Sequence, residues 1–89
     1  MKTVIPEFST MQQEHEKSIL IQQLLGNRIK ELRQKKGLGV KKMAFDCGWD
    51  KSNLQRLERG NANPTLKTLL IICEQLNISV SELLKELDK

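Results

Sequence analysis

A chain of 89 residues with a net charge of +4 is long enough for one small domain and too short to add a separate ligand-binding domain. Aromatic residues make up 3% of the sequence, so a core has to be built from Leu, Ile, Val, Met and Ala, as in compact helical folds. Cys47, Cys73 and the single His15 fit no metal-binding spacing, so we expect no metal and no cofactor. With no secretory leader, acylation motif or long apolar run, the sequence predicts a cytoplasmic protein without membrane contact.

The charge is unevenly distributed along the chain. Residues 28–67 carry eleven Lys and Arg against four acids, whereas the flanking segments 1–21 and 68–89 carry net charges of −1 and −2. This concentration is typical of a nucleic-acid-binding face. A solvated surface that uses lysine for solubility would give the same pattern, so charge alone leaves both interpretations open.

The first third of the chain predicts an arm followed by helix. Residues 1–10 show no period and contain Pro6, which predicts a loosely ordered arm. Residues 11–25 are compatible with a helix that runs into the next one, where Leu25, Ile29 and Leu32 recur at helical spacing. Gly37 ends that helix after a basic last turn.

Residues 40–59 predict two short helices joined by a tight turn. The first spans about 40–47 with Met43 and Ala44 facing inward, Gly48 supplies a left-handed turn, and the second helix spans 51–59 before Gly60. This is a helix-turn-helix pattern, which divides the chain into an N-terminal extension (1–21) and a helix-turn-helix domain (22–89).

The second of these helices has a capped start and a polar outer face. Asp50 is expected to cap it, with Trp49 and Leu54 at the two positions of a hydrophobic staple. Leu54 and Leu57 face inward, so the outward residues are polar or basic: Lys51, Ser52, Gln55, Arg56 and Arg59.

Two further helices follow a loop at residues 61–64. Thr65 is expected to cap the first, and Asn77 to end it in a left-handed conformation. A capping box from Ser79 to Glu82 opens the last helix, expected to reach Lys85 or Leu87. The inward face of the first of these two helices is expected to hold Leu66, Leu69, Ile72, Cys73 and Leu76. The prediction is an all-α, compact five-helix domain with an N-terminal helical extension.

Residues 24–85 resemble the Cro/repressor-type (Xre-like) helix-turn-helix family. The matching segments, in family order, are residues 25–33 (LGNRIKELR), 36–38 (KGL), Met43–Ala44, Gly48, 52–60 (SNLQRLERG), 63–66 (NPTL) and 76–84 (LNISVSELL). The resemblance implies a repressor-like, sequence-specific regulator of transcription that binds double-stranded DNA, expected as a homodimer on a palindromic operator. It implies no enzymatic activity, and the chain shows no set of catalytic residues.

The resemblance also implies roles for individual residues. Lys51, Ser52 and Arg56 fall where the family contacts base edges in the major groove, and Gln55 shares that face. An arginine here can bind O6 and N7 of guanine, although Lys51 could equally contact phosphates. Arg33 and Glu58 match a charged pair that joins the first helix to the recognition helix. Candidate phosphate contacts are Asn53, Arg59, Asn61 and Asn63.

One departure from the family concerns the start of the 40–47 helix. Gly39 and Val40 stand where a polar cap and a phosphate-binding glutamine are often found. Lys41 and Lys42 follow, and cations in a first turn oppose the helix dipole unless an anion docks there. We therefore expect both lysines to contact DNA phosphate; the alternative is two solvated lysines.

Apolar residues outside the expected core leave two interpretations open. Ile19, Leu20 and Leu24 precede the domain, and Leu70 and Ile71 add apolar surface to the 66–76 helix. They either pack onto their own domain or form a dimer interface. A second function, from another class, is a protein-interaction module such as an antitoxin that binds a protein partner through its arm or its C-terminal helix.

Overall fold

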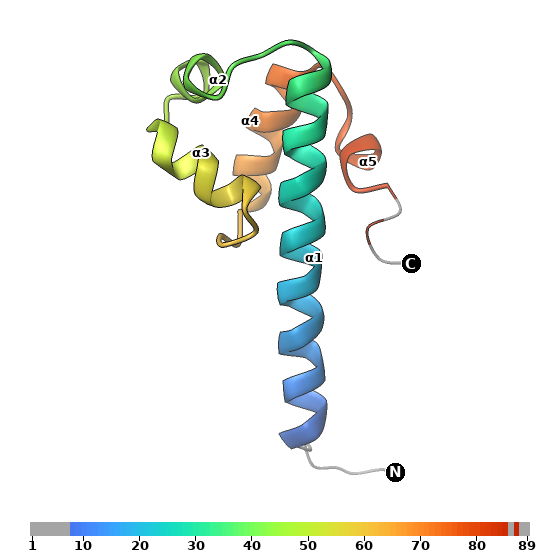
Figure 1. The fold of residues 1–89 in the computed structure, drawn as a ribbon. Coiled ribbons are helices and arrows are strands. Elements are labelled where there is room, and N and C mark those ends of the chain that lie inside the picture. Colours follow the sequence, from blue (N-terminus) through green and yellow to red (C-terminus); the bar gives the residue numbers. More distant parts are fainter. Residues whose placement is uncertain (1–7, 86, 88–89) are drawn as a thin grey trace.

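The computed structural model describes residues 8–85 and 87, and within them all regular structure is helical (Figure 1). This confirms the all-α prediction. Among the described residues, no helix combines the length and hydrophobicity needed to cross a bilayer. The helices are α1 (Phe8–Lys35), α2 (Val40–Cys47), α3 (Lys51–Glu58), α4 (Leu66–Leu76) and α5 (Val80–Leu83).

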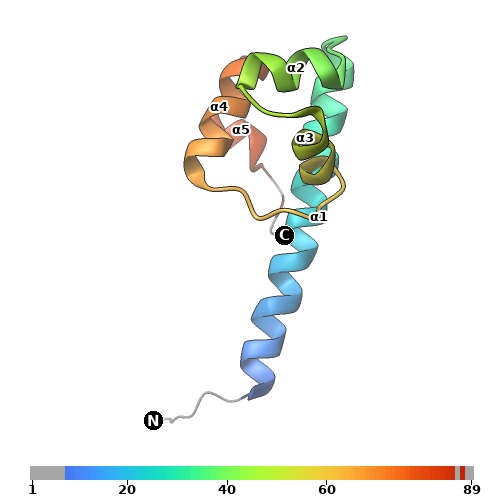
Figure 2. The same cartoon turned by 90° about the vertical axis from the view of Figure 1, so that its left-hand side faces the viewer.

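α1 is one continuous helix of 28 residues that crosses residue 21 without a break. Because it begins at Phe8, residues 8–10 are helical, not part of a loose arm as expected; residues 1–7 lie outside the described part. Figures 1 and 2 show its N-terminal half standing clear of the other helices, and the molecule measures 51 × 24 × 19 Å. The C-terminal half packs against α3 and α5.

The core lies where the C-terminal half of α1 meets the other four helices. As expected, Met43 and Ala44 are buried on α2, and so are Leu54 and Leu57 on α3. The rest of the buried apolar set is Leu25, Ile29, Ile72, Cys73, Leu76 and Leu83. Leu66 was wrongly expected in this core: it is 64% exposed because α4 enters the core progressively, with Leu69 half-buried and Ile72 fully buried.

α2, α3 and α4 each end in a backbone arrangement that turns the chain sharply. The amide of Trp49 donates to Ala44 O (2.8 Å), that of Asn61 to Arg56 O (3.0 Å) and that of Ile78 to Cys73 O (3.0 Å). These bonds satisfy last-turn carbonyls and place the preceding residue in the left-handed region. That residue is Gly48 (φ 80°) after α2 and, as expected, Asn77 (φ 57°) after α4. Gly60, after α3, has φ 82°; α3 ends at Glu58, one residue before the predicted end.

The starts of the helices differ in how they are capped. Thr65 Oγ1 accepts from the Thr68 amide (3.2 Å) and Ser79 Oγ from the Glu82 amide (3.0 Å), as predicted for α4 and α5. Asp50 occupies the cap position of α3, but its side chain makes no capping hydrogen bond, contrary to expectation. Gly39 precedes α2 without a side-chain cap.

α5 ends at Leu83, earlier than the predicted Lys85 or Leu87, and Arg28 explains why. Its guanidinium donates to Leu83 O (Nε, 2.8 Å) and to Glu82 O (Nη2, 2.7 Å). In a longer helix those two carbonyls would accept the amides four residues later. With Arg28 bound to them, the hydrogen bonds that follow α5 span three residues: the Lys85 amide donates to Glu82 O (3.4 Å) and the Leu87 amide to Leu84 O (3.3 Å).

Candidate nucleic-acid interface

α3 presents a polar, cationic face to solvent and an apolar face to the core. Leu54 and Leu57 are buried. Lys51 and Ser52 are exposed, and so is Arg56, which lies one helical turn after Ser52. Asn53 and Arg59 are exposed as well. In the described part of the chain, neither Lys51 nor Arg56 forms an ion pair. Both cations are therefore available to an anionic ligand.

Gln55 differs from the outward position expected for it, because it is half-buried. It lies in a hollow between α1, the start of α2 and α3, bounded by Lys30, Arg33, Glu58 and Arg59. Lys30, Arg33 and Arg59 bring positive charge to the lining of the hollow, and Val40 adds apolar surface to it. Gln55 can therefore present its amide at the edge of the α3 face, but with less freedom than the fully exposed residues beside it.

A buried ion pair holds α3 against α1. Arg33 and Glu58 are 8% and 9% exposed, and the expected pairing is present with both ends engaged: Nε to Oε2 at 2.7 Å and Nη2 to Oε1 at 3.0 Å. Arg33 Nη1 also donates to Leu38 O (2.8 Å), in the loop before α2. One guanidinium thus joins α1, the loop and α3, and it neutralises the Glu58 carboxylate at the C-terminal end of α3.

Gly26 allows α1 to approach the end of α3 closely. A Cβ built at Gly26 would lie 2.7 Å from Glu58 O and still closer to Leu57 O, both backbone atoms. Real Cβ atoms do not come that near a carbonyl oxygen, so only glycine fits at this crossing. Gly26 was not among the residues predicted to matter, although a glycine inside a helix is itself a signal of close packing.

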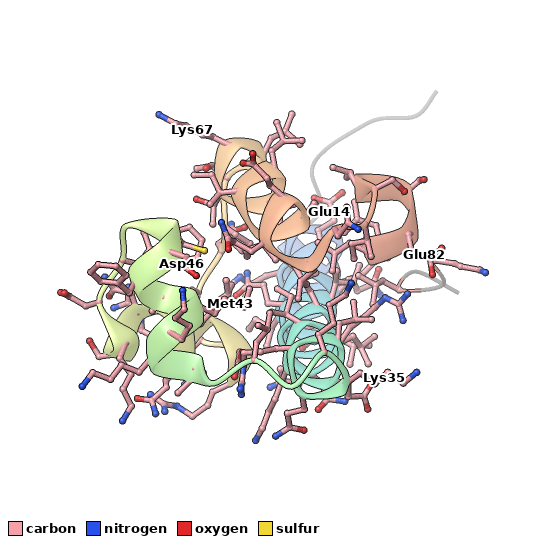
Figure 3. All side chains as sticks on the ribbon, turned by 90° about the horizontal axis from the view of Figure 1, so that it is seen from above. Glu14, Lys35, Met43, Asp46, Lys67 and Glu82 are labelled. Atoms are coloured by element: carbon pink, nitrogen blue, oxygen red, sulfur yellow. The ribbon has the colours of Figure 1, made fainter. Side chains whose placement is uncertain are left out.

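The two lysines of α2 have different surroundings. Lys42 Nζ lies 2.8 Å from Asp46 Oδ2 and 3.1 Å from Oδ1, one helical turn along α2. Lys41 is exposed and, within residues 8–85 and 87, pairs with no carboxylate. Lys41 is therefore the better placed of the two to contact a phosphate, because Lys42 would first have to release the Asp46 carboxylate. In Figure 3 nitrogen-tipped side chains gather along the edge below α2 and α3, while Lys67 points away from that edge.

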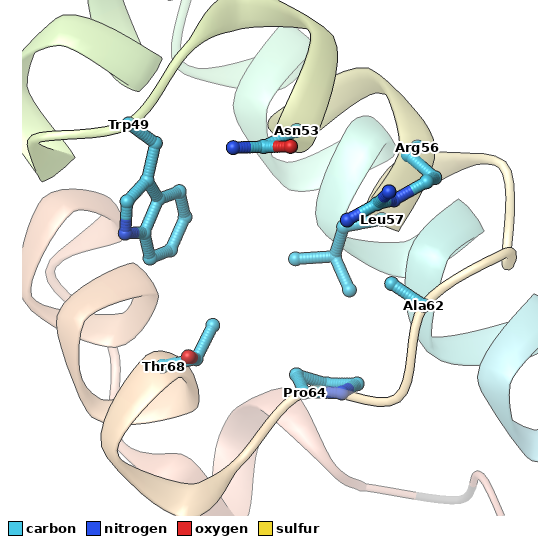
Figure 4. A pocket seen from close by; sticks show the side chains of 7 residues that line it. All are labelled: Trp49, Asn53, Arg56, Leu57, Ala62, Pro64 and Thr68. Atoms are coloured by element: carbon cyan, nitrogen blue, oxygen red, sulfur yellow. The ribbon is translucent and has the colours of Figure 1, made fainter.

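Behind the α3 face lies a hollow between α3 and α4 (Figure 4). Trp49 and Thr68 form one side of it, and Leu57, Ala62 and Pro64 the other; Asn53 and Arg56 border the opening. Trp49 is half-buried against the core, which supports a packing role for its indole. The loop past α3 carries Asn61 and Asn63, and both are exposed.

The cysteines are not part of this face. Burial raises the pKa of the Cys47 thiol, and the neighbouring Asp46 carboxylate raises it further; burial alone raises that of Cys73. Both therefore remain protonated thiols at neutral pH. Among the described residues, no group of three or more His, Cys, Asp or Glu is arranged to hold a metal ion.

The sequence matches a known protein family and resembles known regulators. Residues 29–83 match the HTH_3 (helix-turn-helix) family model. The HTH-type transcriptional regulator y4dJ of Sinorhizobium fredii is 33% identical over 69 residues, which are 78% of this chain and 90% of that protein. The HTH-type transcriptional regulator SinR of Bacillus subtilis is 36% identical over 64 residues, 71% of this chain; the chain spans 58% of SinR.

Solved structures agree with the sequence relatives. The clp gene regulator ClgR of Corynebacterium glutamicum superposes with a TM-score of 0.73 at 28% identity, covering 76% of this chain and 72% of that one. The restriction-modification controller protein C.AhdI of Aeromonas hydrophila gives a TM-score of 0.66 at 38% identity, covering 68% and 88%. The chain belongs to the Xre/Cro-like helix-turn-helix family of DNA-binding transcriptional regulators.

Proposed function

We propose that this protein regulates transcription by placing α3 in the major groove of double-stranded DNA and contacting base edges from its exposed face. The observation that carries the proposal is the two-sided character of α3. Lys51, Ser52 and Arg56 are exposed on a helix whose other side is held by Leu54, Leu57 and the Arg33–Glu58 pair. A helix that is fixed in this way presents its polar side chains in one orientation, as sequence recognition requires.

Within this proposal the α3 residues have distinct roles. Arg56 binds O6 and N7 of a guanine, and Lys51, Ser52 and Gln55 contact neighbouring base edges. Phosphate contacts come from Lys41, Asn53 and Arg59 and from the loop residues Asn61 and Asn63, all of which are exposed. Lys42 joins them only by releasing Asp46, and such exposed pairs contribute about 0.5 kcal/mol or less.

The proposal includes a homodimer on a palindromic operator. A single domain of this size contacts only a few base pairs, so two-fold symmetry doubles the recognised sequence. In helix-turn-helix dimers the half-sites lie one helical turn apart, about 34–36 Å, or a multiple of it. We further propose that the protein acts in the cytoplasm, where its bacterial relatives meet chromosomal DNA.

The proposal is tested by selecting duplexes from a random pool and measuring fluorescence anisotropy on the selected duplex and on a shuffled version over a salt series. We expect preferential binding to the selected duplex, weakening steeply as salt rises because phosphate contacts release counterions. Equal, weak binding to both duplexes would contradict sequence-specific recognition.

Replacing Arg56 by alanine is expected to reduce the preference for the selected duplex over one altered at the contacted guanine by about 1–3 kcal/mol. The matched control is Lys67→Ala, which removes the same charge from α4, away from the α3 face. We expect the control to keep the preference of the wild type. If Arg56→Ala weakens binding to both duplexes by the same factor, Arg56 contacts phosphate and not a base.

A further inference from the structure

The hollow between α3 and α4 exists because these two helices make little contact with each other. α3 packs against α1 and α2, whereas α4 packs against α2 and α5. Trp49 borders one side of the space between them and Pro64 another (Figure 4), and the hollow has a volume of about 200 Å³. An engineered cavity of about 150 Å³ in another protein binds benzene. The hollow therefore has room for one aromatic ring with a short substituent, and none for a helix of a partner protein.

The inner part of the hollow is apolar. The half-buried indole of Trp49 lies on one side, and Leu57, Ala62 and Pro64 lie on the others. A planar ring held among these side chains would pack against the indole, either stacked or edge-on, in the arrangements that aromatic pairs prefer. The lining thus favours an aromatic ring over a purely polar ligand.

The opening of the hollow carries positive charge. Figure 4 shows the Arg56 side chain reaching from α3 toward the hollow, beside Leu57. In the part of the chain that the structure describes, Arg56 forms no ion pair. Its neighbours one turn away on α3 are Ser52, Asn53 and Arg59, none of them acidic, and the nearby Glu58 carboxylate is already bound by Arg33. A cation above an apolar hollow is complementary to an anionic group attached to a ring.

We propose that this hollow binds a small aromatic carboxylate, with the ring between Trp49 and Pro64 and the carboxylate accepting hydrogen bonds from the Arg56 guanidinium. A guanidinium offers two parallel N–H donors, which match the two oxygens of a carboxylate. Both parts of the ligand are needed. A neutral aromatic compound leaves Arg56 without its anion, and a short aliphatic acid leaves the indole uncovered.

Such a ligand competes with DNA for Arg56. In the proposed function this guanidinium binds a guanine, and it cannot bind a carboxylate in the hollow at the same time. Ligand binding therefore weakens DNA binding, and DNA weakens ligand binding by the same factor. The competition rests on the proposed function, whereas binding of the ligand can be measured without DNA.

The hollow is separate from the apolar surface considered for a dimer interface. Ile19, Leu20, Leu24 and Leu70 are between 40% and 53% exposed, and Ile71 is half-buried. None of these five residues lines the hollow. Ligand binding is therefore expected to be independent of any dimer that they form.

The test is two-dimensional proton–nitrogen NMR of the labelled full chain, titrated with benzoate, benzyl alcohol or acetate. Trp49 is the single tryptophan of the chain, so its indole N–H gives one resonance. We expect benzoate to shift this resonance saturably, with a Kd on the order of 1 mM, as for a ligand with few non-hydrogen atoms. Benzyl alcohol, which has the ring without the charge, should bind at least about threefold more weakly. Acetate, which has the charge without the ring, should not shift the resonance.

Three variants separate the contributions to binding. Arg56→Gln removes the charge and is expected to weaken benzoate binding to the level of benzyl alcohol. Lys67→Gln is the matched control, because Lys67 is a cation of α4 that points away from this part of the molecule, and it should bind benzoate as the wild type does. Ala62→Leu places a larger side chain in the hollow and should abolish the shift although Arg56 is still present.

The competition is measured by fluorescence anisotropy on the selected duplex. Benzoate at about ten times its Kd should weaken DNA binding by up to about tenfold, relative to the same concentration of acetate, which matches the ionic strength. Unchanged DNA affinity in the presence of bound benzoate would overturn the competition.

Three results would overturn the ligand site: a Trp49 resonance that benzoate leaves unmoved, benzyl alcohol binding as tightly as benzoate, or Arg56→Gln binding benzoate as tightly as the wild type. Failure of the proposed function is separable. A protein that binds benzoate through Arg56 but prefers no duplex retains the ligand site and loses the function. A protein that does not bind benzoate but prefers its selected duplex does the reverse.

Discussion

Replacing Arg33 by alanine is expected to lower the free energy of unfolding by about 3–5 kcal/mol, because it leaves the Glu58 carboxylate buried without a partner. Glu58 is 9% exposed, and its two oxygens accept from two nitrogens of Arg33. The substitution also removes the bond from Arg33 Nη1 to Leu38 O. Urea unfolding followed by far-UV circular dichroism measures the loss.

The matched control for Arg33→Ala is Lys42→Ala, which breaks a close side-chain ion pair on the surface of α2. Lys42 and Asp46 pair at the surface, 2.8 Å apart, so we expect a loss of about 0.5 kcal/mol or less. Replacing both buried partners by apolar residues, Arg33→Met with Glu58→Leu, should recover most of the stability lost in Arg33→Ala. A loss in Arg33→Ala no greater than in Lys42→Ala would show that the pair does not hold α3 in place.

Replacing Gly26 by alanine is expected to destabilise the domain by about 1–3 kcal/mol, even though alanine favours helix over glycine by about 1 kcal/mol. Helix propensity alone predicts that Gly26→Ala raises the free energy of unfolding, whereas packing predicts that it lowers it. The sign of the measured change therefore shows which effect is larger. The added Cβ would meet Leu57 O and Glu58 O, which belong to the backbone and cannot rotate away. α3 has to shift, and DNA affinity should fall together with stability.

Asn27→Ala is the control for Gly26→Ala, because Asn27 is the next residue of α1 and is exposed. There the propensity gain meets no packing cost, and the stability should stay within about 0.5 kcal/mol of the wild type. If Gly26→Ala is as stable as Asn27→Ala or more so, α1 and α3 are not packed as closely as the structure has them.

Local chemistry explains why most element boundaries could be predicted. Gly48 and Asn77 adopt left-handed backbone conformations, and Thr65 and Ser79 cap their helices, through contacts within a few residues of each one. The misplaced end of α5 has a nonlocal cause. Arg28 lies 55 residues from the carbonyl of Leu83 that it binds, and no local pattern predicts that contact.

The candidate interface was predictable to the extent that it depends on helical period. The inward positions of Leu54 and Leu57 leave Lys51, Ser52 and Arg56 facing outward. The partner of Arg33 was implied only by the family resemblance, because 25 residues separate it from Glu58. The Lys42–Asp46 pair was predictable as well, because opposite charges at i,i+4 spacing in a helix are expected to pair. No pattern in the sequence predicts that Phe45 is 78% exposed, since an aromatic residue in a short amphipathic helix is expected to face the core.

The position of α3 in the major groove can be measured by dimethyl sulfate footprinting on the selected duplex. The reagent methylates guanine N7 in the major groove and adenine N3 in the minor groove, so one experiment reports on both. We expect protection of guanine N7 at two symmetric positions about one helical turn apart, lost in Arg56→Ala, with adenine N3 between them unprotected. Protection of adenine N3 without protection of guanine N7 would place the protein in the minor groove and exclude α3 from the major groove.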